Sequence, residues 1–350
     1  MLQIEPLELA SVDWNAMEYA GGRNFCQGPV WLNFLAATQH GQPLLAVLRD
    51  SSSIAGYFAG MVVQKFGFKI LGSPFPGWST PYMGFNLRPD VDKREALRTL
   101  TRFAFTRLNC MHVEIMDRNI STHDLEGSSC RYRLFSGYEI DLTRSEDEIF
   151  GSMTSACRRC IRKAEKSGVT VEVAEDHDKF VDEYYAQLTD VFAKQRLVPT
   201  YDANRVRLLV EHLAPTNTLL LIRARDPQGR SIATGIFPAI SDTSAYFWGM
   251  ASWRDHQILR PNEALLWYAM RHWKARGVSR FDMGGGGEYK KKYGGAEISV
   301  PWLRVSKYAL LETLRGTALN AAHLRQRVLG RWVADSRQAS PGDAFRSGAK

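Results

Sequence analysis

The sequence predicts an α/β (α+β) protein made of two tandem copies of one module, each a mixed, mostly antiparallel sheet flanked by helices. Three observations lead to this fold class. A chain of 350 residues corresponds to about two domains at roughly 150 residues per domain. Its hydrophobic content of 45% is sufficient for a sizeable core. The same order of predicted strands, loop and helix also occurs twice.

The first copy is predicted over residues 1–143. Apolar residues recur on one face of residues 93–108, which indicates an amphipathic helix, and an earlier helix is predicted over residues 30–39. Short apolar runs bounded by polar turns indicate strands, of which the first two form a hairpin. These strands are expected at residues 44–48, 54–63, 66–71 and 111–116.

Residues 72–84, which follow the third of these strands, form a loop dense in proline, glycine and aromatic residues. Such a loop continues neither a sheet nor a helix, and exposed rings on it suit the wall of a binding site. Trp78 and Tyr82 are therefore candidate substrate-binding residues.

A connector helix is predicted over residues 145–167, at the start of a second copy that spans residues 144–305. Ser145 and Glu148 match a capping box, and Gly168 is placed to end the helix. One face should pack on the core, and another carries a basic row that suits either a solvated surface or a rail for phosphate or nucleic acid. The core-facing residues are Ile149, Met153, Ala156, Cys160 and Ala164, and the basic row is Arg158, Arg162 and Lys166.

The second copy repeats the element order of the first. Pro261 suits the first turn of its helix and Gly277 the end of that helix. The predicted elements are strands at residues 218–224, 231–240 and 243–250, a loop at 251–260, a helix at 261–276, and strands at 278–283 and 298–305.

Beyond residue 305 the sequence predicts a basic helix over residues 306–334 and a disordered tail over residues 335–350. The helix would pack on the core by default, or make a peripheral contact with an acidic membrane. No run is long enough to span a bilayer and no signal peptide is visible, so with five scattered cysteines we expect a cytoplasmic protein. The net charge of +8 favours anionic partners.

The segment from Phe281 to Gly295 is the strongest functional candidate. A strand ends in four glycines, three adjacent lysines follow between two tyrosines, and two more glycines close the segment. Glycines let a backbone and a ligand approach closely, and adjacent lysines attract anions. By composition alone the segment is equally typical of a solvated turn. No phosphate-binding loop, hydrolase elbow or metal-binding motif is found, and nothing in the sequence requires a metal.

From Ser152 to Val305 the chain resembles the FemAB-like branch of the GNAT superfamily of N-acyltransferases. The resemblance rests on four segments in the family's order, and the last is similar to the family's aromatic-Lys-x-x-aromatic-Gly pattern. The segments are Arg158–Val169, Pro261–Trp267, Gly277–Gly285 and Tyr289–Gly295.

This resemblance implies transfer of an acyl group from a carrier to an amine, without a permanently bound cofactor. Acyl-coenzyme A is the donor in many GNAT enzymes, and aminoacyl-tRNA is the donor in Fem-type enzymes that build peptidoglycan cross-bridges. Related acyltransferases serve envelope or polysaccharide synthesis. The implied acceptor is therefore an amine on an envelope precursor, which can be phosphorylated.

The resemblance also implies roles for individual residues. Lys290 matches the patterned lysine and is expected nearest the chemistry or the acceptor's phosphate. Asp282 and Glu288 are candidate bases or amine-orienting groups, although strand-end carboxylates often only cap turns. The remaining candidates fall into two groups, one near a helix N-terminus that could bind carrier phosphates and one that contacts the acceptor. The carrier group is Arg254, Arg260, Asn262, Gly284 and Gly285, and Tyr289 and Tyr293 join Trp78 and Tyr82 in the acceptor group.

Three functions stay open at the level of sequence: an acyl-CoA-dependent N-acyltransferase, a Fem-type aminoacyltransferase, and a non-enzymatic nucleic-acid-binding module. The basic connector helix mildly favours the second, but no long heptad insertion of the kind that grips tRNA is present, which favours the first. The first copy has Asp117–Ile120 in place of the glycine–lysine segment. We therefore expect it to shape the acceptor cleft rather than to hold a second active centre.

Overall fold

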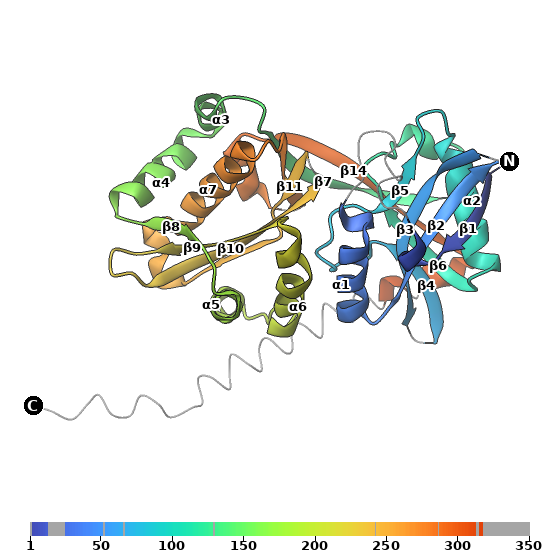
Figure 1. The fold of residues 1–350 in the computed structure, drawn as a ribbon, viewed down its shortest axis with the longest axis horizontal. Coiled ribbons are helices and arrows are strands. Elements are labelled where there is room, and N and C mark those ends of the chain that lie inside the picture. Colours follow the sequence, from blue (N-terminus) through green and yellow to red (C-terminus); the bar gives the residue numbers. More distant parts are fainter. Residues whose placement is uncertain are drawn as a thin grey trace, which may run out of the picture.

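The structure, a computed structural model, describes residues 2–12, 25–51, 53–65, 67–128, 130–241, 243–285, 287–312 and 315–317. It forms two lobes, one on each side of a pair of long strands (Figure 1). One lobe contains the elements of the first predicted copy, and the other those of the second. The mixed α/β fold class is thereby confirmed.

The predicted duplication is visible in how the strands pair. In the first lobe β4 and β6 run parallel, and β5 leaves the main sheet path to pair with β3. In the second lobe β11 and β13 run parallel, and β12 leaves the path to pair with β10. The first series is β2 (Gln42–Asp50), β3 (Ser53–Lys65), β4 (Phe68–Ser73), β5 (Gly84–Leu87), α2 (Lys93–Thr106) and β6 (Cys110–Met116). The second is β9 (Leu219–Arg225), β10 (Ser231–Ser241), β11 (Ser244–Tyr246), β12 (Gly249–Ser252), α7 (Pro261–Ala275) and β13 (Arg280–Gly285).

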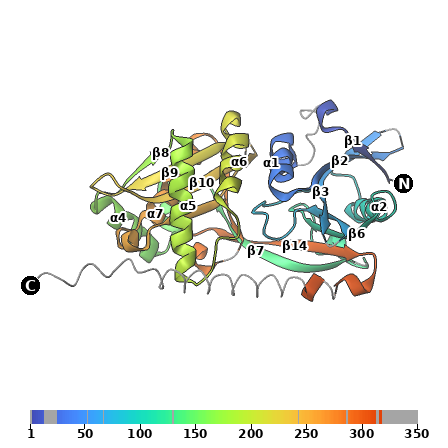
Figure 2. The same ribbon diagram turned by 90° about the horizontal axis from the view of Figure 1, so that it is seen from below.

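Two long strands join the lobes into one sheet. β14 (Ala296–Ser306) lies between β6 and β7 (Arg131–Asp141), and β7 in turn pairs with β13. Figure 2 shows both strands running from one lobe to the other. The strand order is β1-β2-β3-β4-β6-β14-β7-β13-β11-β10-β9-β8, with β1 at Leu2–Leu7 and β8 at Thr170–Val173. The boundary predicted between residues 143 and 144 stays a prediction, and each bridging strand pairs with elements on the other side of it.

The lobes also share a hydrophobic core. α1 (Pro29–Gln39) of the first lobe packs against α6 (Ala203–Leu213) of the second, next to α5 (His177–Lys194). Trp31 and Phe34 on α1 belong to the same buried cluster as Tyr184 on α5 and Leu209 on α6. On the other face of the second lobe's sheet, α4 (Ser155–Lys166) and α7 cover a separate core. The strands β1, β5, β7 and β8 and the helices α5 and α6 were not predicted.

The predicted connector helix is wrong as one continuous element. The chain forms α3 (Glu146–Ser152) and then α4, with Met153 and Thr154 in extended conformations between them. The capping box of Ser145 and Glu148 is confirmed, and Gly168 follows α4 with φ +73°. Thr154 starts a new helix because its hydroxyl accepts a hydrogen bond from the amide of Cys157. The break changes the helical phase, so that Ala156, expected in the core, is exposed and Cys157 is buried instead.

The predicted strand 243–250 differs from expectation, and the predicted helix 306–334 lies largely outside the described residues. The single strand expected over residues 243–250 is divided into β11 and β12. Of the predicted helix 306–334, residues 309–312 and 315–317 are helical, and the remainder, like the tail 335–350, lies outside the described residues. Among the described residues, no helix has the length and apolar character needed to cross a membrane.

Candidate active site

The candidate site begins where β11 and β13 separate. These strands pair in parallel only as far as Tyr246 and Asp282, and the amide of Phe247 makes one last bond to the carbonyl of Asp282 at 2.8 Å. Beyond this point β12 follows β10, whereas β13 follows β7 through an irregular register after Asp282. The hydrogen-bonded ladder between β11 and β13 therefore ends at this point.

Asp282 lies at this point of separation with no exposed surface. Its Oδ1 accepts a hydrogen bond of 2.6 Å from the amide of Gly284, whose positive φ of +67° suits glycine. The phenol of Tyr82, from the other lobe, interacts electrostatically with this carboxylate. Burial raises the pKa of Asp282 to about 6, although the Gly284 hydrogen bond and the positive charge of Arg118 oppose the rise. Such a carboxyl can exchange a proton near neutral pH.

Lys290 is held close to Asp282 by the 3₁₀ helix η7 (Glu288–Tyr293). Its side chain is buried, and Nζ donates hydrogen bonds to the carbonyl oxygens of Met283 at 2.5 Å and Gly285 at 3.1 Å. Nζ also lies 4.9 Å from the centre of the Phe247 ring, at the separation of the strands. Burial lowers the pKa of Lys290 to about 8, against the opposing pull of Asp282. The structure thus brings together Lys290 and Asp282, two of the three predicted catalytic residues.

The other predicted residues of this segment lie differently. Glu288 is exposed at the start of η7, and Tyr289 is 52% exposed beside Lys290, with its ring centre 5.9 Å from Nζ. Tyr293 is buried in the core of the second lobe, so the expectation that it contacts the acceptor is wrong for this conformation. Lys292 pairs with Glu263 on α7 at 2.7 Å. Of the three lysines, Lys291 is the exposed one.

Three of the predicted carrier residues, Arg254, Arg260 and Asn262, lie at or just before the N-terminus of α7. Arg260, in the N-cap position, adopts a left-handed conformation and supplies no capping hydrogen bond, and its side chain is exposed. Asn262, one residue into the helix, has a buried Oδ1 without a hydrogen-bond partner among the described residues. Arg254 does not join them as a free cation, because its Nε lies 3.1 Å from Asp190 on α5. Gly285 is explained by packing, since a side chain there would collide with the Phe135 ring.

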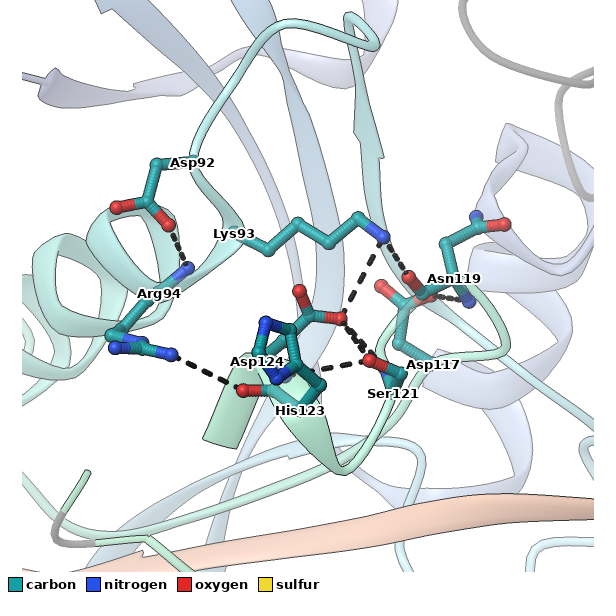
Figure 3. A network of polar contacts seen from close by, with 8 residues as sticks. All are labelled: Asp92, Lys93, Arg94, Asp117, Asn119, Ser121, His123 and Asp124. Atoms are coloured by element: carbon teal, nitrogen blue, oxygen red, sulfur yellow. Dashed lines mark hydrogen bonds and ion pairs between the residues drawn. The ribbon is translucent and has the colours of Figure 1, made fainter. Parts of the chain in front are cut away.

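The equivalent position in the first lobe is filled by its own side chains. Where β4 and β6 separate, Ser73 Oγ accepts a 2.7 Å hydrogen bond from the amide of Gly84, and Asp117 Oδ2 accepts one of 2.7 Å from Phe85. Asp92 caps the N-terminus of α2, where a network of charged side chains gathers (Figure 3). The first lobe thus has side-chain hydrogen bonds both where its strands separate and at the N-terminus of α2.

The aromatic loop between β4 and β5 is buried rather than exposed. Trp78 and Tyr82 retain only 7% and 3% of their exposure, so the predicted wall of exposed rings is wrong. Trp31 donates to Thr80 at 3.2 Å. From the second lobe, the guanidinium of Arg205 donates to the carbonyl of Trp78. The loop therefore seals the junction between the lobes.

A cavity of about 500 Å³ opens at this junction. It lies between the C-terminal half of α1 and the segment that joins α5 to α6, and its lining includes His40, Tyr185, Tyr201 and Arg205. The ring of Tyr201 lies 5.3 Å from that of Trp248, the residue after Phe247. Trp248 and Phe247 belong to different hydrophobic cores, so the cavity adjoins the chain after β11 on the side of the core shared by the lobes.

Sequence reasoning missed three charged residues that the structure places at the junction. Arg118 and Glu139 form an ion pair of 2.5 Å beside Asp282, and Arg205 holds the aromatic loop. A signal existed for Arg118, since it follows the last strand of the first copy as the lysine segment follows that of the second. Glu139 lies on an unpredicted strand, and Arg205 on an unpredicted helix.

Comparison with known proteins agrees with this geometry. A family model described as an acetyltransferase (GNAT) domain matches residues 151–292. Similar solved structures include FemX, with a TM-score of 0.65 at 12% identity over 85% of this chain and 96% of that chain. A tandem GNAT protein from the clavulanic acid biosynthesis pathway has a TM-score of 0.52 at 10% identity, covering 87% and 98% respectively.

A third similar structure is the C-terminal domain of a putative lysylphosphatidylglycerol synthetase from Agrobacterium fabrum. Its TM-score is 0.52 at 14% identity, over 76% of this chain and 86% of that chain. A sequence comparison with curated proteins finds no match. At such identities the likeness to solved structures concerns the fold. Residues 151–292 thus match a GNAT acetyltransferase domain, and the chain as a whole has a fold similar to that of FemX and of a tandem GNAT protein.

Proposed function

We propose that this protein is an N-acyltransferase that moves an acyl group from a carrier, acyl-CoA in the first instance, to an amine on an envelope or polysaccharide precursor in the cytoplasm. One observation carries the proposal. A buried lysine, Lys290, and a buried carboxyl, Asp282, meet where two parallel strands of a GNAT-type sheet separate. Their pKa values of about 8 and about 6 leave both able to act near neutral pH.

The reaction needs an unprotonated amine and a place for developing negative charge. The amine nitrogen attacks the carbonyl carbon of the thioester, a C–N bond forms, and the oxygen becomes an oxyanion that the ammonium of Lys290 stabilises. Collapse of this intermediate breaks the C–S bond and releases the thiolate. Asp282 takes up the proton that the amine loses, and the hydroxyl of Tyr82 links that carboxyl to the junction between the lobes.

The carrier's phosphates are assigned to the N-terminus of α7. Its unsatisfied amides and positive dipole end attract anions, and the N-cap residue Arg260 adds an exposed charge without occupying those amides. The unpartnered Oδ1 of Asn262 is available to accept a hydrogen bond from the carrier. In the first lobe Asp92 occupies the corresponding helix end, which favours a single carrier site per chain.

The acceptor is assigned to the cavity at the junction. Aromatic rings and polar side chains line it, together with Arg205, whose Nε has no hydrogen-bond partner among the described residues. Such a lining suits a polar precursor that carries sugar, amide or phosphate groups. Tyr201 in the lining lies 5.3 Å from Trp248, which follows β11 in the sequence, and the acceptor is proposed to enter the site from this side.

A second candidate is transfer of an aminoacyl group from tRNA. The observation that favours it is the basic face of α4, on which Arg159, Arg162 and Lys163 are exposed. α4 begins at the active-site segment, because the amide of Thr154 donates to the carbonyl of Lys292. A polyanionic carrier whose end lies at Lys290 would be able to follow this face.

Titration of the full-length protein with acetyl-CoA and with bulk tRNA, each at 50 and 200 mM salt, tests these assignments. Saturable acetyl-CoA binding with a shallow salt dependence is expected. Salt-steep binding to tRNA, but not to an unrelated duplex DNA titrated in parallel, would support the aminoacyl donor. Salt-steep binding to any nucleic acid, without a saturable carrier site, would indicate a non-enzymatic module, and binding to neither carrier would contradict both transferase assignments.

A further inference from the structure

Two carboxylates face each other across neighbouring strands at the site. Asp282 on β13 is in direct register with Glu139 on β7, and the regular pairing stops immediately after Asp282. Like charges at directly opposed positions destabilise a sheet unless a cation lies between them. Here the cation is Arg118, from the turn after β6, which makes an ion pair of 2.5 Å with Glu139.

Arg118 also lies over the ring of Tyr82. Its guanidinium carbon lies 5.8 Å from the centre of the Tyr82 ring, and the phenol of that ring interacts electrostatically with Asp282. The side chain of Glu139 is 15% exposed, and that of Arg118 is 28% exposed. The Arg118–Glu139 ion pair is therefore mostly shielded from water. A fully exposed pair would hold its two side chains in a less fixed geometry.

We propose that Arg118, restrained by Glu139, is a positioning residue that holds Tyr82 against Asp282, so that the reaction centre of the second lobe is completed by the first lobe. This inference deepens the proposed function and rests on the assignment of Asp282 as the proton acceptor. It also gives the first lobe a role beyond shaping the acceptor cavity.

Arg118 and Glu139 affect the pKa of Asp282 in opposite directions, and this difference can be tested. Arg118 favours the ionised form of Asp282, whereas Glu139 opposes it. The remaining titratable groups that face this carboxyl are on separate elements and stay unchanged in the test. They are Cys26 on the 3₁₀ helix Phe25–Gln27, Tyr82 on the aromatic loop, Tyr246 on β11 and Lys290 on η7.

The experiment compares Arg118→Gln, Arg118→Lys and Glu139→Gln in the full-length protein. Because Arg118→Gln removes a positive charge, the acid limb of kcat/KM should move up by about one pH unit, and Glu139→Gln should move it down. kcat should fall roughly tenfold in Arg118→Gln with KM nearly unchanged, and Arg118→Lys should recover part of the loss. Glu146→Gln, which breaks the exposed pair with Arg271, is the control and should move neither limb.

Carbon-13 NMR of labelled aspartate, assigned with Asp282→Asn, reads the titration of this carboxyl directly. Midpoints that move in opposite directions support the inference. If they do so while the acid limb of activity stays fixed, the positioning by Arg118 stands and the proposed role of Asp282 fails. Unchanged midpoints in folded Arg118→Gln and Glu139→Gln overturn the inference. Should Arg118→Gln fail to fold, Glu139→Gln and Arg118→Lys decide by the same criterion.

Discussion

At the scale of single residues, burial gives Lys290 its distinct chemistry. Lys291 and Lys292 have the same side chain, but the first is exposed and the second is neutralised by Glu263. Only the environment of Lys290 combines two backbone carbonyls, an aromatic face and a depressed pKa. The family pattern predicted which of the three lysines matters, whereas its burial required the three-dimensional structure.

Replacement of Lys290 by alanine should therefore lower kcat roughly 100-fold or more, because the oxyanion loses its buried cation. If the charged form is required, the wild-type rate should decline as the pH rises through about 8, the pKa of Lys290. Steady-state kinetics between pH 5 and 10 test both expectations. Lys291→Ala is the matched control and should keep wild-type rates, and an equal loss in both variants would contradict the assignment.

The stability of the fold should also depend on Asp282. In the folded protein this carboxyl keeps its proton up to about pH 6, whereas an unfolded aspartate loses it near pH 4. Ionised Asp282 therefore reduces stability increasingly between these pH values, and by a constant amount above them. Asp282→Asn should raise the free energy of unfolding at pH 8 by on the order of 2 kcal/mol, with no gain below about pH 4.

Urea unfolding of Asp282→Asn and the wild type at pH 3.5, 5 and 8 measures this difference. Glu288→Gln, which alters an exposed carboxylate of the same segment, should show no such pH-dependent gain. A lower stability of Asp282→Asn at pH 8 would mean that the ionised carboxylate is better solvated or paired than its burial implies.

At the scale of elements, the two copies share a topology. They differ in the side chains at the separated strands and at the N-terminus of the helix. The first copy closes its separated strands with Ser73 and Asp117 and caps α2 with Asp92. The second leaves the N-terminus of α7 uncapped. Duplication was predictable from the repeated order of apolar runs. The closing hydrogen bonds were not, because they join residues that are distant in sequence.

The connector region shows a second limit of pattern reading. A helical repeat of apolar residues extends through Met153, but Thr154 is a capping residue that restarts the helix. The capping box at Ser145 could be predicted because its two residues, Ser145 and Glu148, are close in sequence. The break was hidden because no proline marks it, and the nearby Gly151 is itself helical in α3. Strand β7 was missed for a different reason, since the side chains of residues 131–134 are exposed and show no alternation.

The uncapped end of α7 leads to a prediction about the carrier. Arg260→Glu should raise the KM for acetyl-CoA roughly tenfold and leave kcat nearly unchanged, because the phosphates meet a like charge far from the bond that breaks. The measurement is kcat and KM with acetyl-CoA at fixed acceptor concentration. Arg98→Glu, an exposed arginine on α2 of the other lobe, is the control. A fall in kcat alone would place Arg260 at the chemistry instead.

At the scale of the whole molecule, the lobes are mutually dependent. One hydrophobic cluster includes residues from α1, α5 and α6, and the bridging strands β7 and β14 pair across the predicted boundary. The boundary predicted between residues 143 and 144 divides the sequence, but one hydrophobic core contains residues from both sides of it. Composition and element order predicted two copies correctly, and only the pairing of distant strands reveals that they form one sheet.

Residues 1–143 and 144–350 expressed as separate fragments should therefore fail to fold independently. Each would lose a neighbour of a bridging strand and expose one side of the shared core. Circular dichroism and proteolysis of each fragment, alone and after co-expression, provide the measurement. Recovery of native-like protection upon co-expression is expected, and a cooperative thermal transition of the isolated first fragment would contradict this dependence.

The position of β14 has a consequence for how the chain is made. Among the described residues β14 is the last strand along the chain, yet it lies between β6 and β7, two strands of the first 141 residues. During translation, β6 therefore lacks this neighbour until residues near 300 have left the ribosome. At the usual rates of synthesis this is an interval of roughly 10 to 30 seconds. An unpaired strand edge is a site of unwanted pairing with other chains. The nascent first lobe thus carries an open strand edge until β14 has been made.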